Sequence, residues 1–273
     1  MIPKVIHYCW FGGKPLTPMA EECIASWREK MPDYEIVEWN ESNFDFSSCE
    51  FALKAYENKK WAFVSDYCRT WVLYNHGGIY LDTDVTAYKK FDDILNSDFF
   101  IGCEDVGWLE SSTIGALPGH ELIKTVLESF QKTDFDLNKG WEIICTMPMR
   151  LTDAVTARYG LRRVKNKITR LPDATIYPRE YFSPLLYGQS EAKITENTYT
   201  VHLFNASWIE NKNKAGIPVM LKKAFSSNGS ILIVLLLFLF CGIRFGNDFL
   251  NATNLLNIVK QMSITGIAAI GIN

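Results

Sequence analysis

Strand-like and helix-like segments alternate along the N-terminal part of the chain, and this alternation restricts the folds that it can adopt. Apolar residues at helical spacing and runs of β-forming residues predict helices at 19–30, 51–59 and 62–75, and strands at 4–10, 34–39 and 79–81. Gly77-Gly78 suits a stop after the last of these helices. Strands separated by helices are typical of βα units, so we expect an α/β fold with a mostly parallel mixed sheet and helices on both faces. Such sheets bind ligands beyond the carboxyl ends of their strands.

Composition and charge exclude several classes of protein. With 273 residues, of which 48% are hydrophobic and 22% charged, the chain has enough apolar material for a core. A disordered, collagen-like or coiled-coil chain is therefore excluded. The net charge of -3 argues against a nucleic-acid binder. The seven cysteines are scattered without a C-x-x-C pair, which indicates reduced intracellular thiols.

Two aspartates follow the strand at 79–81. Asp82 and Asp84 are two residues apart, so in an extended chain both carboxylates face the same side. Carboxylates this close repel one another unless a proton or a cation lies between them. Their hard oxygen atoms favour Mg²⁺ or Mn²⁺, which commonly bind substrate phosphates as well. The alternative is an ordinary solvated Asp-x-Asp turn.

The helix at 62–75 carries a second pair of charges. Asp66 and Arg69 are three residues apart on a helix that is otherwise almost entirely apolar, so they are neighbours on one face. One interpretation is a simple structural ion pair. The other is a binding site, because a sugar offers hydroxyl partners to buried charges and a guanidinium suits phosphate or sugar oxygens.

Four segments carry a recognisable pattern: IPKVIHYCWFGG, WAFVSDYCRTWVLYNHGGIYLDTDV, IYPREYFSP and VHLFNASW. Together they resemble the DXD-containing sugar-transferring glycosyltransferases, a family that includes initiating α-1,6-mannosyltransferases and bacterial capsular polysaccharide transferases. The resemblance spans roughly residues 1–208. It implies a GT-A, Rossmann-like fold, a UDP- or GDP-sugar donor, Mn²⁺ or Mg²⁺ as cofactor, and retention of anomeric configuration.

The same resemblance implies roles for individual residues. Asp66 and Arg69 would bind the donor sugar, Asp82 would lie near the ribose and the metal, and Asp84 would bind the metal directly. Residues implied to lie beside the nucleotide or the diphosphate are His7, Tyr8, Trp10, Ser207 and Trp208. His202 would be a further metal ligand.

Without the family context, a core histidine at a strand end is the better interpretation of His202. The chain departs from the family at 146–148, where Thr-Met-Pro stands in place of Thr-Gly-Pro. We expect this change to narrow the acceptor pocket.

The predicted activity is transfer of a hexose to a glycan or lipid-linked saccharide acceptor in bacterial capsular or surface polysaccharide synthesis, by same-face attack. The alternatives are a metal-dependent phosphohydrolase or glycosidase using the same carboxylates and, from the tail alone, a transport component. Hydrolases usually need more metal ligands or two flanking carboxylates, and the sequence shows neither.

The C-terminal part differs sharply in composition. Residues 231–243 contain no charge, and extended to 226–245 they are long enough for a transmembrane helix. A buried core helix is the alternative. The excess of lysine before this segment predicts a cytoplasmic catalytic domain associated with the inner membrane. We therefore expect a domain at 1–225 and a hydrophobic tail at 226–273, which resembles a truncated N-terminus of a ribose-type sugar ABC transporter permease.

Overall fold

The computed structural model describes residues 1–105, 107–136, 146–185 and 191–204. The chain divides into two units, Met1–Trp208 and Ile209–Asn273, and the fold below is that of the first unit. Its helices are α1 (Pro18–Lys30), α2 (Glu50–Glu57), α3 (Trp61–His76), α4 (Glu121–Gln131), α6 (Met147–Tyr159) and the short 3₁₀ turn η2 (Arg179–Tyr181). Its strands are β1 (Val5–Cys9), β2 (Glu35–Trp39), β3 (Gly78–Leu81), β4 (Val85–Ala87), β5 (Phe99–Asp105), β6 (Trp108–Ala116), β7 (Thr169–Arg170), β8 (Thr175–Tyr177) and β9 (Thr200–His202).

A seven-stranded sheet in the order β2-β1-β3-β6-β5-β8-β7 forms the centre of this unit. The pairs β1–β2, β1–β3 and β5–β8 are parallel, whereas β3–β6, β5–β6 and β7–β8 are antiparallel. The predicted α/β class with a mixed sheet is confirmed, but parallel pairs do not predominate in it. The physical reason is that β5 and β6 are joined by a connection too short for a helical crossover, which forces them to run antiparallel.

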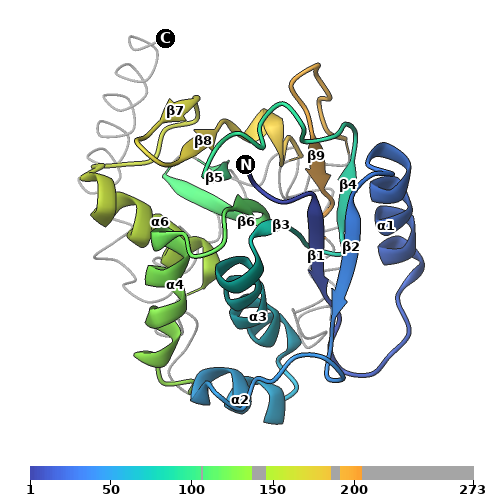
Figure 1. The fold of residues 1–273 in the computed structure, drawn as a ribbon, viewed down its shortest axis with the longest axis vertical. Helices are drawn as coiled ribbons and strands as arrows, with labels where there is room; N and C mark the ends of the chain where they lie inside the picture. Colours follow the sequence, from blue (N-terminus) through green and yellow to red (C-terminus); the bar gives the residue numbers. More distant parts are fainter. Residues whose placement is uncertain (106, 137–145, 186–190, 205–273) are drawn as a thin grey trace, which may run out of the picture. The chain divides into compact units, whose positions relative to one another are not determined.

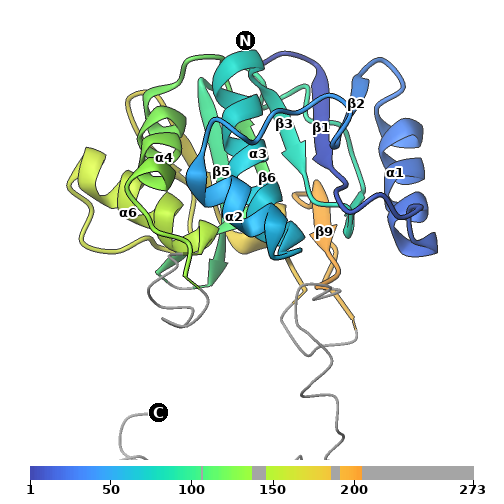
Figure 2. The ribbon, with the colours of Figure 1, turned by 90° about the horizontal axis from the view of Figure 1, so that it is seen from below.

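Helices cover both faces of the sheet, as predicted. On one face α2, α3, α4 and α6 pack around a shared core (Figures 1 and 2). On the other face lies α1, whose Ile24 and Trp27 are buried against Ile6 and Ile79 of the central strands. The small antiparallel pair of β4 and β9 lies next to α1, since Trp27 donates a hydrogen bond to the Val85 carbonyl (2.7 Å).

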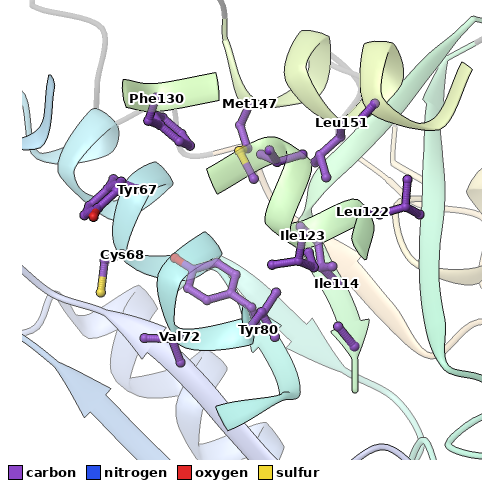
Figure 3. Packing of buried hydrophobic residues seen from close by; sticks show 14 of the residues in the cluster. Tyr67, Cys68, Val72, Tyr80, Ile114, Leu122, Ile123, Phe130, Met147 and Leu151 are labelled. Atoms are coloured by element: carbon purple, nitrogen blue, oxygen red, sulfur yellow. The ribbon is translucent and has the colours of Figure 1, made fainter. Parts of the chain in front are cut away.

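The packing of α3 against the sheet fixes the position of the central strands. Figure 3 shows Tyr67 and Val72 of α3 in the same cluster as Tyr80 of β3 and Ile114 of β6. Val72, Tyr80 and Ile114 are at most 1% exposed. Each apolar side chain buried in this way contributes about 1.5–3 kcal/mol, so α3 and β3 form one rigid unit.

A pair of glycines ends α3 and starts β3. Gly77 and Gly78 have φ of 65° and 98°, a region that side chains with a Cβ atom rarely adopt. A Cβ at Gly77 would also lie 2.5 Å from Cδ of Pro118. This confirms the predicted glycine stop after the helix, and it lets β3 begin at once, so that its carboxyl end lies at Asp82.

Several predictions concern residues outside the described part. The transmembrane helix, the permease-like segment at 226–273, and Ser207 and Trp208 all fall there. Within the described ranges, none of the helices has the length and apolar character that a membrane span requires. The division of the chain at residue 225 stays a prediction.

Candidate active site

Backbone hydrogen bonds anchor the turn that carries Asp82 and Asp84 on two sides. The Asp82 N–H donates to the Ser112 carbonyl of β6 (2.9 Å), and the Leu203 N–H donates to the Asp84 carbonyl (2.9 Å). Within the turn, the Val85 N–H donates to the Asp82 carbonyl (3.0 Å). The two aspartates are therefore held at the carboxyl end of β3, which is the edge where the sequence analysis expected a ligand site.

The pairing of β4 with β9 brings His202 to the same place. His202 lies opposite Val85 in this antiparallel pair, and its Nε2 is 3.3 Å from Oδ1 of Asp84. One ligand atom from each of Asp82, Asp84 and His202 lies within 4.8 Å of the others. Burial lowers the pKa of His202, but the carboxylates of Asp84, Asp82 and Glu110 outweigh this effect and leave the pKa raised.

The three side chains fit a divalent cation. Two carboxylates and one imidazole, each about a fifth to a quarter exposed, supply hard oxygen atoms and one nitrogen. Three ligands on one side leave further coordination positions for phosphate oxygens or water. This donor set is the one predicted from the sequence.

Arg69 connects the helix to this turn. Its Nη2 lies 3.0 Å from Oδ1 of Asp66 and 3.0 Å from Oδ1 of Asp82. Its Nη1 donates to the Ser111 carbonyl (2.7 Å), and the guanidinium lies 4.4 Å above the ring of Tyr80. The predicted proximity of Asp66 and Arg69 is confirmed, whereas the contact with Asp82 was not predicted.

The charge of Arg69 compensates only in part for the burial of the Asp66 carboxyl group. Its side chain is 15% exposed, and burial raises its pKa to about 6, although the charge of Arg69 acts in the opposite direction. Because Arg69 stabilises its charged form only in part, this carboxylate is a strong hydrogen-bond acceptor for hydroxyl groups that enter the site.

The His7 ring forms hydrogen bonds within the protein, and its position beside a nucleotide stays a prediction. Its Nδ1 accepts a hydrogen bond from Nε1 of Trp39 (3.1 Å), and its Nε2 donates to the Gly77 carbonyl (3.0 Å). Burial lowers the pKa of His7 to about 4. Both nitrogens of a neutral imidazole are thus used within the protein, and none remains for a ligand.

Tyr8 and Trp10, which were also assigned to the nucleotide, lie near the end of β1. Tyr8 is buried and donates its hydroxyl hydrogen to Oε2 of Glu38 (2.7 Å). Trp10 is half-buried directly after the strand, and its Nε1 donates to the Lys14 carbonyl (2.6 Å). Their contact with a nucleotide stays a prediction.

Met147 of the Thr-Met-Pro segment is a buried core residue, and the narrowing of an acceptor pocket by this segment stays a prediction. It begins α6, is 2% exposed and belongs to the core cluster (Figure 3). Its Sδ accepts a hydrogen bond from Oγ1 of Thr70 in α3 (3.9 Å). The side chain therefore fills space between helices.

Glu110 is a polar residue that sequence reasoning missed. It lies on β6, is 2% exposed, and its Oε2 accepts a hydrogen bond from Ser112 (3.1 Å). Burial raises its pKa to about 8, while the charge of His202 acts in the opposite direction. The only signal in the sequence was a glutamate at the start of the strand-like run 108–116.

The fold and the site together define an α/β protein with a donor set for a divalent cation and an arginine beside it. Residues 18–101, which include Asp66, Arg69, Asp82 and Asp84, match the family described as glycosyltransferase sugar-binding region containing DXD motif. This match agrees with the resemblance drawn from the sequence over residues 18–101.

Curated relatives include an inositol phosphoceramide mannosyltransferase 3 of Schizosaccharomyces pombe, 26% identical over 50% of this chain and 39% of the relative. A mannosyl phosphorylinositol ceramide synthase of Saccharomyces cerevisiae is also 26% identical, over 49% of this chain and 36% of the relative. An uncharacterized glycosyltransferase of Acanthamoeba polyphaga mimivirus is 25% identical over 76% of this chain and 84% of the relative. The chain thus spans well under half of the length of the first two relatives.

Two solved glycosyltransferases show a distant similarity. The PaToxG glycosyltransferase aligns with a TM-score of 0.47 and 19% identity over 58% of this chain and 70% of that one. A glycosyltransferase involved in the glycosylation of the major capsid of PBCV-1 aligns with a TM-score of 0.43 and 12% identity over 74% of this chain and 94% of that one.

Proposed function

We propose that this chain is a metal-dependent, retaining glycosyltransferase that moves a hexose from a nucleotide-sugar to a glycan or lipid-linked saccharide. The observation that carries the proposal is the meeting of Asp82, Asp84 and His202, with ligand atoms within 4.8 Å, beside an arginine at the carboxyl end of β3. This arrangement suits a diphosphate whose charge is shared between a cation and a guanidinium.

Mn²⁺ or Mg²⁺ bound by Asp82, Asp84 and His202 would supply positive charge that stabilises the departing nucleoside diphosphate. Arg69 holds Asp82 in place and adds a second positive charge near the same oxygens. Such fixed charges contribute most where charge develops during the reaction. Asp66, joined to Arg69, is placed to accept hydrogen bonds from the donor sugar.

The stereochemical course and the substrates follow from analogy with the family. Because no residue is marked by the sequence as a nucleophile, we favour same-face attack with retention, by analogy with the family. The fungal relatives are named as mannosyltransferases and ceramide-linked synthases, so mannose from a GDP-sugar is the first donor to test. A role in bacterial capsule or surface polysaccharide synthesis is part of the same proposal.

The test is incubation of the full chain with UDP-glucose, UDP-galactose or GDP-mannose and Mn²⁺, with release of nucleoside diphosphate as the readout. We expect one donor to be consumed with Mn²⁺ and none in EDTA, and we expect the Asp84→Asn variant to be inactive. Thermal shifts with UDP and GDP identify the nucleotide independently of turnover.

The reaction products distinguish transfer from hydrolysis. If a sugar acceptor accelerates nucleoside diphosphate release and becomes glycosylated, the transferase proposal holds. If release is equally fast without any acceptor and free sugar accumulates stoichiometrically, the carboxylates serve a hydrolase and the proposal fails.

A further inference from the structure

The carboxyl group of Glu110 has one satisfied and one unsatisfied oxygen. Oε2 accepts a hydrogen bond from Oγ of Ser112 (3.1 Å), whereas Oε1 is fully buried and has no hydrogen-bond partner among the described residues. A buried polar atom without a partner destabilises the folded state. A group that carries this cost is expected to have a function that offsets it.

Gly102 on the neighbouring strand β5 leaves space for the Glu110 side chain. A Cβ atom on Gly102 of β5 would lie 3.2 Å from both Cγ and Oε1 of Glu110, and 2.9 Å from Cδ2 of Phe182. Any side chain at 102 would therefore push into Glu110 or into the Phe182 ring. The glycine on the neighbouring strand thus forms a slot that holds the carboxyl group in place.

Contacts between β6 and β9 show which residues lie above this slot. Oγ1 of Thr113 on β6 lies 3.2 Å from Oγ1 of Thr200 on β9. Thr200 and His202 are two residues apart on β9, so they face the same side. His202 therefore also faces β6, toward the end of the strand where Glu110 lies, and the two side chains interact electrostatically.

A histidine that binds a metal through one ring nitrogen usually donates the other N–H to a carboxylate or carbonyl group, which fixes the orientation of the ring. Nε2 of His202 faces Asp84 at 3.3 Å. We propose that Glu110 is a positioning residue: its unpaired carboxyl oxygen accepts a hydrogen bond from the His202 ring when the cation is bound, and this keeps the imidazole in the orientation that binds the cation. This inference rests on the metal site in the proposed function.

The experiment measures Mn²⁺ affinity of the full chain by electron paramagnetic resonance, in the absence of any sugar donor. Glu110→Gln keeps the size of the side chain but removes the carboxylate, and it should weaken Mn²⁺ binding by about 10- to 100-fold. In a His202→Ala background the same substitution should have no further effect, because the residue acts through the ring. Glu22→Gln, at an exposed position on α1, is the matched control and should bind Mn²⁺ normally.

Two further measurements guard against a merely structural effect. Long-range ¹H–¹⁵N spectra of the His202 ring should show a change of tautomer balance in Glu110→Gln at an unchanged melting temperature. Ser112→Ala, which removes only the hydroxyl that orients the carboxyl group, should weaken Mn²⁺ binding in the same direction by a smaller factor, and it decides the question if Glu110→Gln fails to fold.

The outcomes separate this inference from the proposed function. If the wild-type chain binds no Mn²⁺, both the metal site and the role of Glu110 are wrong. If the wild type binds Mn²⁺ and Glu110→Gln binds it equally well, only the role of Glu110 is overturned. Equal weakening in the wild-type and His202→Ala backgrounds also overturns it, because Glu110 would then act as a general negative charge.

Discussion

Arg69 and Asp82 form an ion pair with Nη2 and Oδ1 3.0 Å apart, which joins the middle of α3 to the end of β3. Arg69 is only 4% exposed, so the pair is shielded from solvent. The same guanidinium also contacts Asp66. The buried guanidinium of Arg69 therefore contacts two carboxylates for which separate functions were predicted, sugar binding for Asp66 and metal binding for Asp82.

Arg69→Ala should destabilise the protein strongly. Removing the cation leaves Asp66 and Asp82 facing one another without a compensating charge, and breaking a buried ion pair from one side costs about 3–5 kcal/mol. Urea unfolding followed by circular dichroism at neutral pH measures this loss. Arg28→Ala, at an exposed position on α1, should change the free energy of unfolding by less than about 0.5 kcal/mol. Equal stability of both variants would contradict the structural role of Arg69.

Asp66→Asn should reduce catalysis without reducing stability. Arg69 keeps Asp82 and the Ser111 carbonyl as partners, so the network survives the change. Because burial raises the pKa of Asp66 to about 6, its favourable contribution to stability is present below pH 4 and is lost as the pH rises through 6. The neutral variant should therefore be at least as stable as the wild type at pH 8.

The kinetic effect of Asp66→Asn tests its contact with the donor sugar. Loss of a hydrogen bond to a charged group costs about 1.5–3 kcal/mol, so kcat/KM should fall by about 10- to 100-fold. Affinity for the free nucleoside diphosphate, measured by calorimetry, should stay within about 3-fold because that ligand lacks the sugar. An equal loss of affinity for both ligands would place Asp66 elsewhere in the site.

Asp84→Asn should abolish Mn²⁺-dependent binding of the nucleotide while the fold is retained. The variant removes a proposed metal ligand, and it also removes one of two carboxylates that repel one another without a cation. We expect turnover to fall by at least about 100-fold and the melting temperature to stay equal or rise slightly. Asp33→Asn, at an exposed position distant in sequence from Asp84, is the control. Normal activity of Asp84→Asn in EDTA-treated, Mg²⁺-restored buffer would falsify the assignment.

His7 should make the stability of the protein sensitive to mild acid. Burial lowers its folded-state pKa to about 4, below the ordinary value of 6.5, so the unfolded chain binds a proton more readily. The contribution of the neutral His7 ring to the free energy of unfolding is fully present above pH 6.5 and falls as the pH drops toward 4. It amounts to about 3 kcal/mol. The difference in unfolding free energy between wild type and His7→Gln should shrink by this amount from pH 7 to pH 4. A constant difference would show that the ring titrates normally.

A chain ending at residue 225 should keep the donor-binding activity of the full chain. The described site residues from Asp66 to His202 all precede that position, and the apolar run 231–243 supplies no ligand type for this chemistry. The shortened chain should be monodisperse in size-exclusion chromatography with an unchanged melting temperature, and the full chain should need detergent. Loss of folding on truncation would show that the apolar segment is a core helix of the enzyme.

Local patterns were sufficient to predict several parts of the fold and the site. The sequence predicted α3, the glycine stop after it and the strand that precedes Asp82. These features depend on the periodicity of apolar residues and on backbone conformations that neighbouring residues impose. The proximity of Asp66 and Arg69 follows from helix geometry alone. The family pattern, which combines these features, is also contained in the sequence.

Tertiary structure decided which distant groups meet. The sequence spacing shows no reason for His7 to be enclosed by Trp39 and Gly77, because that contact depends on the parallel pairing of β1 with β2 and β3. The antiparallel β5–β6 hairpin likewise made the sheet mixed. Glu110 became a buried, half-satisfied acid only because Gly102 of the neighbouring strand leaves a slot for it. The physical reason is that strand register and packing are set by the whole core, and residues far apart in sequence acquire defined distances only once that core has formed.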